Sequence, residues 1–209
     1  MSINRRKYKG YKEYLKHQSK KMDIGVKKKI NKFMPEYFSN NVRSFEKRIG
    51  KFKKYIKTGQ VLCLGARTGA EVVAFRNLGF KDTIGIDINP GENNEYVIKG
   101  DFHNMKFKNN SFDIVYCNCI DHSWDLRKLS KEIFRVSKDD AFLLLEIDHL
   151  VKKSKKERKS LLKRDSKYES VMWDDFDDIK NELKEFKFVK DFISAHPAFL
   201  SVIFKKISK

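Results

Sequence analysis

The strongest constraint on the fold is a strand–turn–helix pattern that begins at Val61. The apolar run Val61 to Leu64 ends at Gly65, a second glycine follows at Gly69, and Ala70 to Leu78 has the composition of a helix. Glycine lets a backbone pass close to a ligand, and the first turn of a helix offers unpaired N–H groups. A second apolar run ends in a carboxylate, Asp87, about 20 residues after the first glycine, where an acid can hold ribose hydroxyls. The pattern predicts the first half of a nucleotide-binding unit.

The rest of the chain predicts strands that alternate with helices. The Gly100–Asp101–Phe102 segment follows a short strand, and apolar runs predict further buried strands. The expected strands are 83–87, 96–99, 112–117 and 141–147, and the expected helices are 70–78, 124–136, 151–167 and 173–186. Ser137 to Asp140 reads as a turn, and residues 88–95 as a turn-rich loop that replaces a helix. This order predicts an α/β three-layer, Rossmann-like fold with a mostly parallel sheet.

The first 58 residues predict a basic helical extension in front of a domain at 59–209. Apolar residues at near-helical spacing predict an amphipathic helix over Lys7 to Met22. Gly25 should break it, and a second short helix, Val26 to Met34, should end before Pro35. A third helix, capped by Ser39 or Asn40, should run to about Ile56.

The net charge of +18 is concentrated in the extension. Residues 1–60 hold 19 Lys and Arg against 4 Asp and Glu, whereas residues 61–150 hold 11 against 14. A basic arm over residues 1–57 suits an anionic partner such as RNA. The alternative is a compositional bias toward lysine, which the scarcity of arginine favours.

Other features bear on the compartment. No apolar run approaches the roughly 20 residues needed to cross a bilayer, and the N-terminus lacks an apolar signal region. Only three cysteines occur, at positions 63, 117 and 119, without zinc-ligand spacing. We therefore expect a cytoplasmic protein without a disulfide framework.

A motif between Gly100 and His122 sharpens the functional interpretation. There the sequence resembles the class I S-adenosylmethionine-dependent methyltransferases, especially the type-11 group, whose "D…LPF…SFD-V…EH" pattern it follows. The resemblance covers about Val61 to Asp148. It implies an antiparallel C-terminal strand, with residues 188–193 and 198–204 as the closing pair of the sheet. It also implies an N-terminal helical segment that closes over S-adenosyl-L-methionine and touches the substrate.

The resemblance also implies a cofactor site. Gly65, Ala66 and Gly69 would line the methionine and ribose part, and Asp87 would take the ribose hydroxyls. Asp101 would accept from the adenine amino group, and Phe102 would lie against the ring. Asn118 would border the methyl group, and Ile88 is a further expected cofactor-binding residue. Two residues depart from the family pattern. The family has an acid where Cys63 stands and a glycine where Arg67 stands. Arg67 would meet the cofactor's carboxylate or narrow the site.

The catalytic candidates follow the buried strands. Asp121 and His122 come directly after one strand, and a histidine that titrates near neutrality is a suitable general base. The alternative is that His122 caps the next helical region or packs under the cofactor. His149, beside Asp148, is the second candidate. Asp121, Asp148 and His149 would in principle suit a divalent metal, but the pattern is not specific, and we predict no metal site.

The sequence therefore predicts methyl transfer from S-adenosyl-L-methionine to a small-molecule or glycan-type acceptor. One alternative is an RNA methyltransferase that uses the basic arm. Another alternative is a non-catalytic binding protein of the same fold, because Cys63 and Arg67 depart from the family pattern at the cofactor site. A nicotinamide oxidoreductase is disfavoured because the third glycine of the dinucleotide fingerprint is absent.

Overall fold

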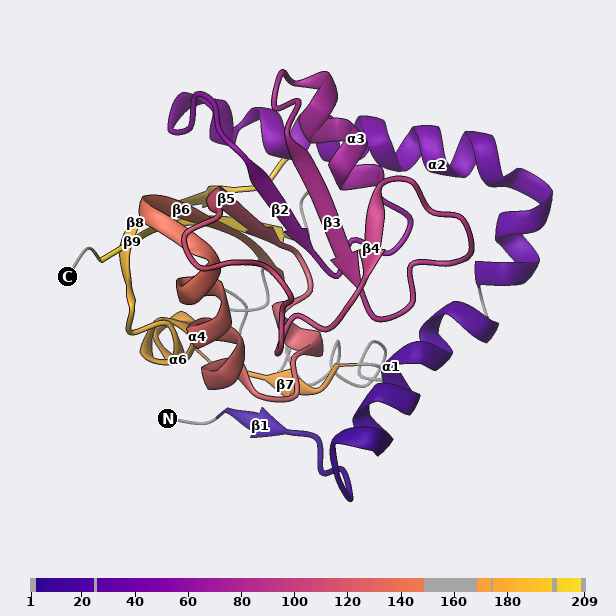
Figure 1. Ribbon diagram of the computed structural model, residues 1–209, viewed down its shortest axis with the longest axis horizontal. Helices are drawn as coiled ribbons and strands as arrows, with labels where there is room; N and C mark the ends of the chain where they lie inside the picture. Colours follow the sequence, from indigo (N-terminus) through magenta and orange to yellow (C-terminus); the bar gives the residue numbers. More distant parts are fainter. Residues whose placement is uncertain (1–2, 25, 149–168, 174, 197–198, 208–209) are drawn as a thin grey trace.

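The computed structural model describes residues 3–24, 26–148, 169–173, 175–196 and 199–207 of the 209-residue chain. Seven strands form one sheet in the order β4-β3-β2-β5-β6-β9-β8 (Figure 1). Their bounds are β2 Val61–Leu64, β3 Thr83–Asp87, β4 Val97–Lys99, β5 Phe112–Cys117, β6 Ser137–Asp148, β8 Phe186–Ile193 and β9 Phe199–Lys206. Two further strands, β1 Asn4–Arg5 and β7 Val171–Met172, pair with each other. The helices are α1 Tyr11–Ile24, α2 Val26–Gly50, α3 Ala70–Asn77, α4 Leu126–Val136 and α6 Phe176–Glu182, with 3₁₀ turns η1 Phe52–Lys54 and η2 Ile120–His122.

The sheet has the predicted mixture of strand directions. Strands β4, β3, β2, β5 and β6 run parallel, and β9 is antiparallel to both β6 and β8. The predicted fold class and its antiparallel C-terminal strand are therefore confirmed. The loop at residues 88–96 joins β3 to β4 without a helix, as the turn-rich sequence predicts.

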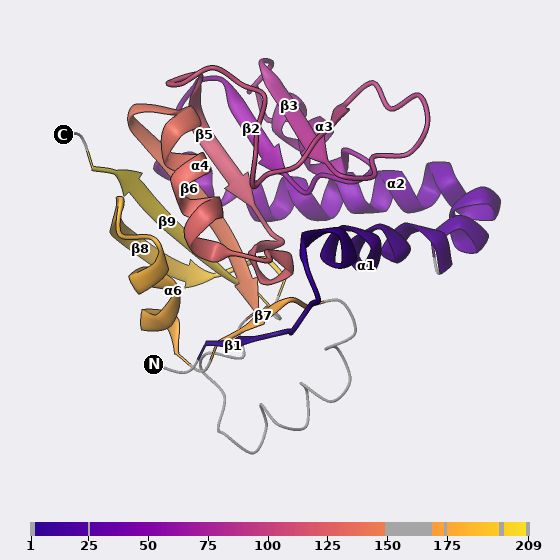
Figure 2. The same cartoon turned by 60° about the horizontal axis from the view of Figure 1, so that its bottom comes forward.

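Helices cover both faces of the sheet because alternate strand residues point to opposite sides. On one face, β2 and β5 pack against α2 and α3 through residues such as Cys63, Tyr116, Ile49 and Phe75. On the other face, strand residues meet α4 and α6 (Figure 2). Helix α2 thus belongs to the same core as α3, and the predicted boundary at residue 58 stays a prediction. Among the described residues, no helix is both long and apolar enough to span a membrane.

Several sequence-based boundaries were wrong. Helix α2 runs through Pro35 without a break, and the expected cap, Ser39, instead donates its hydroxyl to the carbonyl of Pro35 at 2.7 Å, a bond made inside a helix. The expected turn at residues 137–140 is the start of β6, because Ser137 pairs with Phe112 of β5. The register between the two strands shifts after this pair, and Asp140 has a left-handed φ of +63° there.

The helix expected at 173–186 also has wrong bounds. It is only α6, because the Asp175 carboxylate accepts from the N–H of Asp177 in a capping box and β8 already begins at Phe186. Helix α1 begins at Tyr11 rather than Lys7. The helix expected at 151–167 lies outside the described residues.

Candidate functional site

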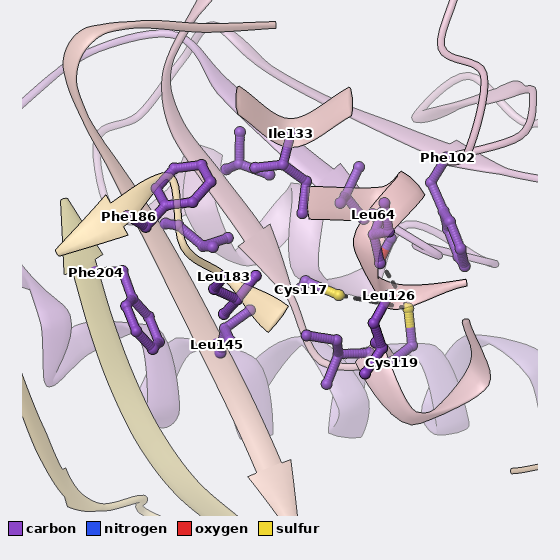
Figure 3. Packing of buried hydrophobic residues seen from close by; sticks show 14 of the residues in the cluster. Leu64, Phe102, Cys117, Cys119, Leu126, Ile133, Leu145, Leu183, Phe186 and Phe204 are labelled. Atoms are coloured by element: carbon purple, nitrogen blue, oxygen red, sulfur yellow. Dashed lines mark hydrogen bonds between the residues drawn. The ribbon is translucent and has the colours of Figure 1, made fainter. Parts of the chain in front are cut away.

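The turn after β2 passes close to the strand beside it. Gly65 has a φ of +64°, and a Cβ atom there would lie 2.3 Å from the Sγ atom of Cys119. That thiol donates to the Leu64 carbonyl at 3.4 Å (Figure 3). No side chain fits at Gly65, because the thiol of Cys119, in the segment after β5, fills that space.

Asp87 holds this turn in place. Its Oδ2 atom accepts from the backbone N–H of Arg67 at 3.1 Å, and its Oδ1 atom accepts from the N–H of Asn89 at 2.8 Å. Arg67 has a left-handed φ of +43°, so the backbone keeps the conformation that suits glycine although the residue is arginine. Gly69, with a φ of +86°, then starts α3.

Two adjacent cavities open at the carboxyl ends of the strands. The larger has a volume of about 460 Å³ and the smaller about 60 Å³. Four residues line both: Gly65, Arg67, Cys119 and His122. Because β3 and β5 lie on opposite sides of β2 in the sheet, the cavities sit where the strand order reverses, which is the usual ligand site of such sheets.

Most of the predicted cofactor residues line these cavities. The larger cavity is bordered by Gly65, Ala66, Arg67 and Asn118, and the smaller one by Gly65, Arg67, Asp87, Ile88 and Phe102. Gly69 and Asp101 line neither of the two. Gly69 instead lies against Tyr96, where a Cβ atom would come within 2.5 Å of the tyrosine Cβ.

Asp101 is engaged by protein groups. Tyr11 donates its hydroxyl to Asp101 Oδ2, and the N–H of His103 donates to Oδ1 at 2.8 Å. Burial opposes ionisation of this carboxyl, but the hydrogen bonds from His103 and Tyr11 outweigh it and hold the pKa of Asp101 below its usual value. The adenine contact expected of Asp101 would have to share the carboxylate with these donors.

Helix α1 covers the smaller cavity. The sequence did not indicate which residues of this helix line it. Tyr14 and Gln18 line it, and the Tyr14 ring is only 2 % exposed. Tyr11 lies 4.8 Å from Trp124 between ring centroids and 5.4 Å from Tyr14, so aromatic packing fixes the helix on the domain. The near-helical spacing of the tyrosines was the signal that the sequence offered for this helix.

The larger cavity has aromatic and acidic walls that the sequence did not indicate. These residues are Tyr37, Phe45, Trp173 and Phe199, with Glu71, Glu146 and Glu169. Glu146 is buried and fully engaged. It accepts from Tyr116 at 2.5 Å and from Ser194 at 2.7 Å, and it forms an ion pair with Arg48 at 3.2 Å.

His122 occupies a central position among the catalytic candidates. It ends η2 and lines both cavities, whereas Asp121 lines only the larger one. Its Nε2 atom is 4.0 Å from Asp121 Oδ2. His149 lies outside the described residues. Within the described part of the chain, no three His, Cys, Asp or Glu side chains form a group that could hold a metal ion.

The sheet order, the glycine turn after β2 and the acid at the end of β3 match the Rossmann-like fold of the class I S-adenosylmethionine-dependent methyltransferases. Residues 62–145 match the family described as "Methyltransferase domain". The resemblance to this class, and to its type-11 group, is therefore confirmed.

Solved structures support the same fold. A Thermotoga maritima S-adenosylmethionine-dependent methyltransferase, described as a possible histamine N-methyltransferase, superposes with a TM-score of 0.62 at 19% identity over 85% of this chain and 98% of its own. An Archaeoglobus fulgidus methyltransferase has a TM-score of 0.62 at 16% identity over 83% and 98%. One from Methanosarcina mazei has a TM-score of 0.59 at 17% identity over 76% and 98%. No curated protein sequence matches the chain.

Proposed function

We propose that this protein transfers a methyl group from S-adenosyl-L-methionine to a small acceptor molecule. The observation that carries the proposal is the shared wall of the two cavities, made of Gly65, Arg67, Cys119 and His122. The smaller cavity supplies Asp87 and Phe102 for the nucleoside, and Gly65 borders both cavities. When bound, the cofactor supplies an electrophilic methyl group, and the protein's task is to align an acceptor and exclude water.

The larger cavity suits a small acceptor. Its volume of about 460 Å³ falls in the usual range for small-molecule sites. Aromatic side chains from α2, β9 and the segment after β7 offer flat apolar faces to a ring, whether planar or a sugar. Asp121 and Glu169 add negative charge. The description of the Thermotoga neighbour makes small amines worth testing beside glycan-type hydroxyl compounds.

His122 is the residue placed to take a proton from the acceptor. It borders both cavities, so a nucleophile in the larger one would meet it next to the methyl donor. A hydroxyl acceptor needs such a base, whereas a neutral amine needs it less. Asp121 would orient the imidazole from the cavity side.

Calorimetric titration with S-adenosylmethionine, S-adenosylhomocysteine and NAD tests the proposal. We expect the first two to bind and NAD not to bind. Asp87→Ala should weaken the binding at least tenfold, and the exposed Asp82→Ala should leave it unchanged. Absence of binding by the wild type would favour a non-catalytic binding protein instead. Binding of NAD alone would favour an oxidoreductase.

One observation favours a second candidate, an RNA methyltransferase. A broad groove of about 740 Å³ follows the N-terminal segment and α1, and six of the ten residues that line it are Lys or Arg. They are Arg6, Lys7, Lys9, Lys12, Lys16 and Lys20. The concentration of basic side chains in this groove supports the proposal of an anionic partner such as RNA.

A further inference from the structure

The inference begins with Cys63, which stands where the related methyltransferases carry an acid. Its side chain is fully buried in the core shared by β2, α2 and α3, and it lines neither cavity. Burial, followed by the nearby Glu71 carboxylate, raises the pKa of the thiol well above its usual value. Position 63 therefore offers no negative charge to a ligand.

Glu71 brings a carboxylate to the same neighbourhood from the first turn of α3. It is only 4 % exposed, yet it lines the larger cavity beside Arg67 and Ala70. Among the described residues, no other residue donates a hydrogen bond to its carboxylate or forms an ion pair with it; the carboxylate interacts with its own backbone N–H. Burial disfavours the charged form of this carboxyl group, so an ammonium group that enters the cavity would stabilise that form.

Arg67 supplies the opposite charge from the turn that precedes α3. It lines both cavities, and the ion pairs among the described residues do not include its guanidinium group. Burial raises the pKa of Glu71, and the positive charge of Arg67 opposes this increase, so the two side chains interact electrostatically. The cavity wall thus presents a cation beside an enclosed carboxyl group, which becomes an anion when a neighbouring cation lowers its pKa.

These charges complement a zwitterion. The amino-acid part of S-adenosylmethionine carries an ammonium group and a carboxylate on one carbon atom. We infer that Glu71 binds this ammonium group and Arg67 binds this carboxylate, so that the acid missing from β2 is replaced by one from α3. The inference rests on the proposed function. It explains the two departures from the family pattern, Cys63 and Arg67, by one mode of binding the amino-acid part of the cofactor.

Ligands that lack the carboxylate or the whole amino-acid part distinguish the role of Glu71 from that of Arg67. Affinities would be measured by calorimetry for S-adenosylhomocysteine, decarboxylated S-adenosylmethionine and methylthioadenosine, which lacks the whole amino-acid part. Glu71→Gln keeps the shape and removes the charge, and Arg67→Met keeps an apolar stem. The exposed Glu92→Gln serves as the matched control.

We expect Glu71→Gln to weaken S-adenosylhomocysteine at least tenfold and to leave methylthioadenosine unchanged, which also shows that the variant is folded. Arg67→Met should weaken S-adenosylhomocysteine similarly but leave decarboxylated S-adenosylmethionine within twofold of the wild type. Wild-type affinity of both variants for S-adenosylhomocysteine would overturn the inference, and so would an equal loss for all three ligands. If the wild type binds none of the ligands, the proposed function fails, and the inference fails with it.

Discussion

At the scale of single residues, the enclosed carboxyl group of Glu71 makes stability depend on pH. Burial raises its pKa from 4.5 to about 8, against the lowering influence of Arg67 and Arg48, while Asp87 adds to the increase. The folded state therefore holds a proton that the unfolded state has lost between these pH values, and stability falls as pH rises through this window.

Glu71→Gln removes this dependence. We expect the variant to gain stability relative to the wild type as the pH rises from 5 to 8, by up to several kcal/mol, measured by thermal unfolding of both proteins at each pH. Glu92→Gln, on the exposed loop after β3, should show no such gain. A constant difference between Glu71→Gln and the wild type across this range would contradict the raised pKa.

The left-handed backbone at Arg67 leads to a second residue-scale prediction. A side chain at a φ of +43° costs about 1 kcal/mol relative to glycine. Arg67→Gly should therefore unfold at a higher urea concentration than Arg67→Ala, with a difference in unfolding free energy of about 1 kcal/mol. Both lack the guanidinium group and should lose S-adenosylhomocysteine affinity equally. Equal stability of the two variants would mean that the turn relaxes when the arginine is removed.

Residues that line the cavities differ in how far sequence could reveal them. Gly65, Asp87 and His122 were predicted because they follow strands, and parallel strands bring their carboxyl ends to one edge. Glu71 was missed because a glutamate in a first helical turn ordinarily faces solvent and favours the helix dipole. Only the packing of α3 on β2 shows that this carboxyl group is enclosed.

At the scale of elements, α1 acts as one wall of the smaller cavity. Tyr14 is almost fully buried and packs against Tyr11 and Trp124. The Tyr14→Ala variant should lose these contacts, so that the α1 amides exchange hydrogen faster while those of α3 do not. Its affinity for S-adenosylhomocysteine should fall about tenfold, roughly 1.4 kcal/mol. Lys12→Ala, on the exposed side of α1, should change neither quantity, and unchanged exchange in Tyr14→Ala would show that α1 does not depend on this ring.

The boundaries of elements were less predictable than their order. Proline normally ends a helix, yet α2 continues past Pro35 because Val42 and Ile49 on its later turns bury their side chains in the core with α3. Burial of this kind outweighs local preference, and it depends on partners far away in the sequence. The same holds for Ser137, whose pairing with β5 decided between a turn and a strand.

At the scale of the whole molecule, the two signs of charge occupy different places. The larger cavity has several acidic residues in its wall, whereas the basic groove lies outside, along the N-terminal segment and α1. A polyanion would therefore be attracted to the groove and repelled from the cavity. This separation favours a role of the arm in docking a larger anionic partner, while a smaller group enters the site.

Short single-stranded RNA tests the basic groove. Its affinity should fall with salt, with a logarithmic slope of about −0.7 for each phosphate contacted. Lys12→Glu with Lys16→Glu should weaken binding and reduce this slope. Lys187→Glu with Lys190→Glu on β8 changes the net charge equally on exposed positions outside the groove and should have a smaller effect, because salt screens distant charges. If RNA affinity fell equally in the two double variants, net charge alone would attract RNA. The lysine content of the arm would then reflect compositional bias.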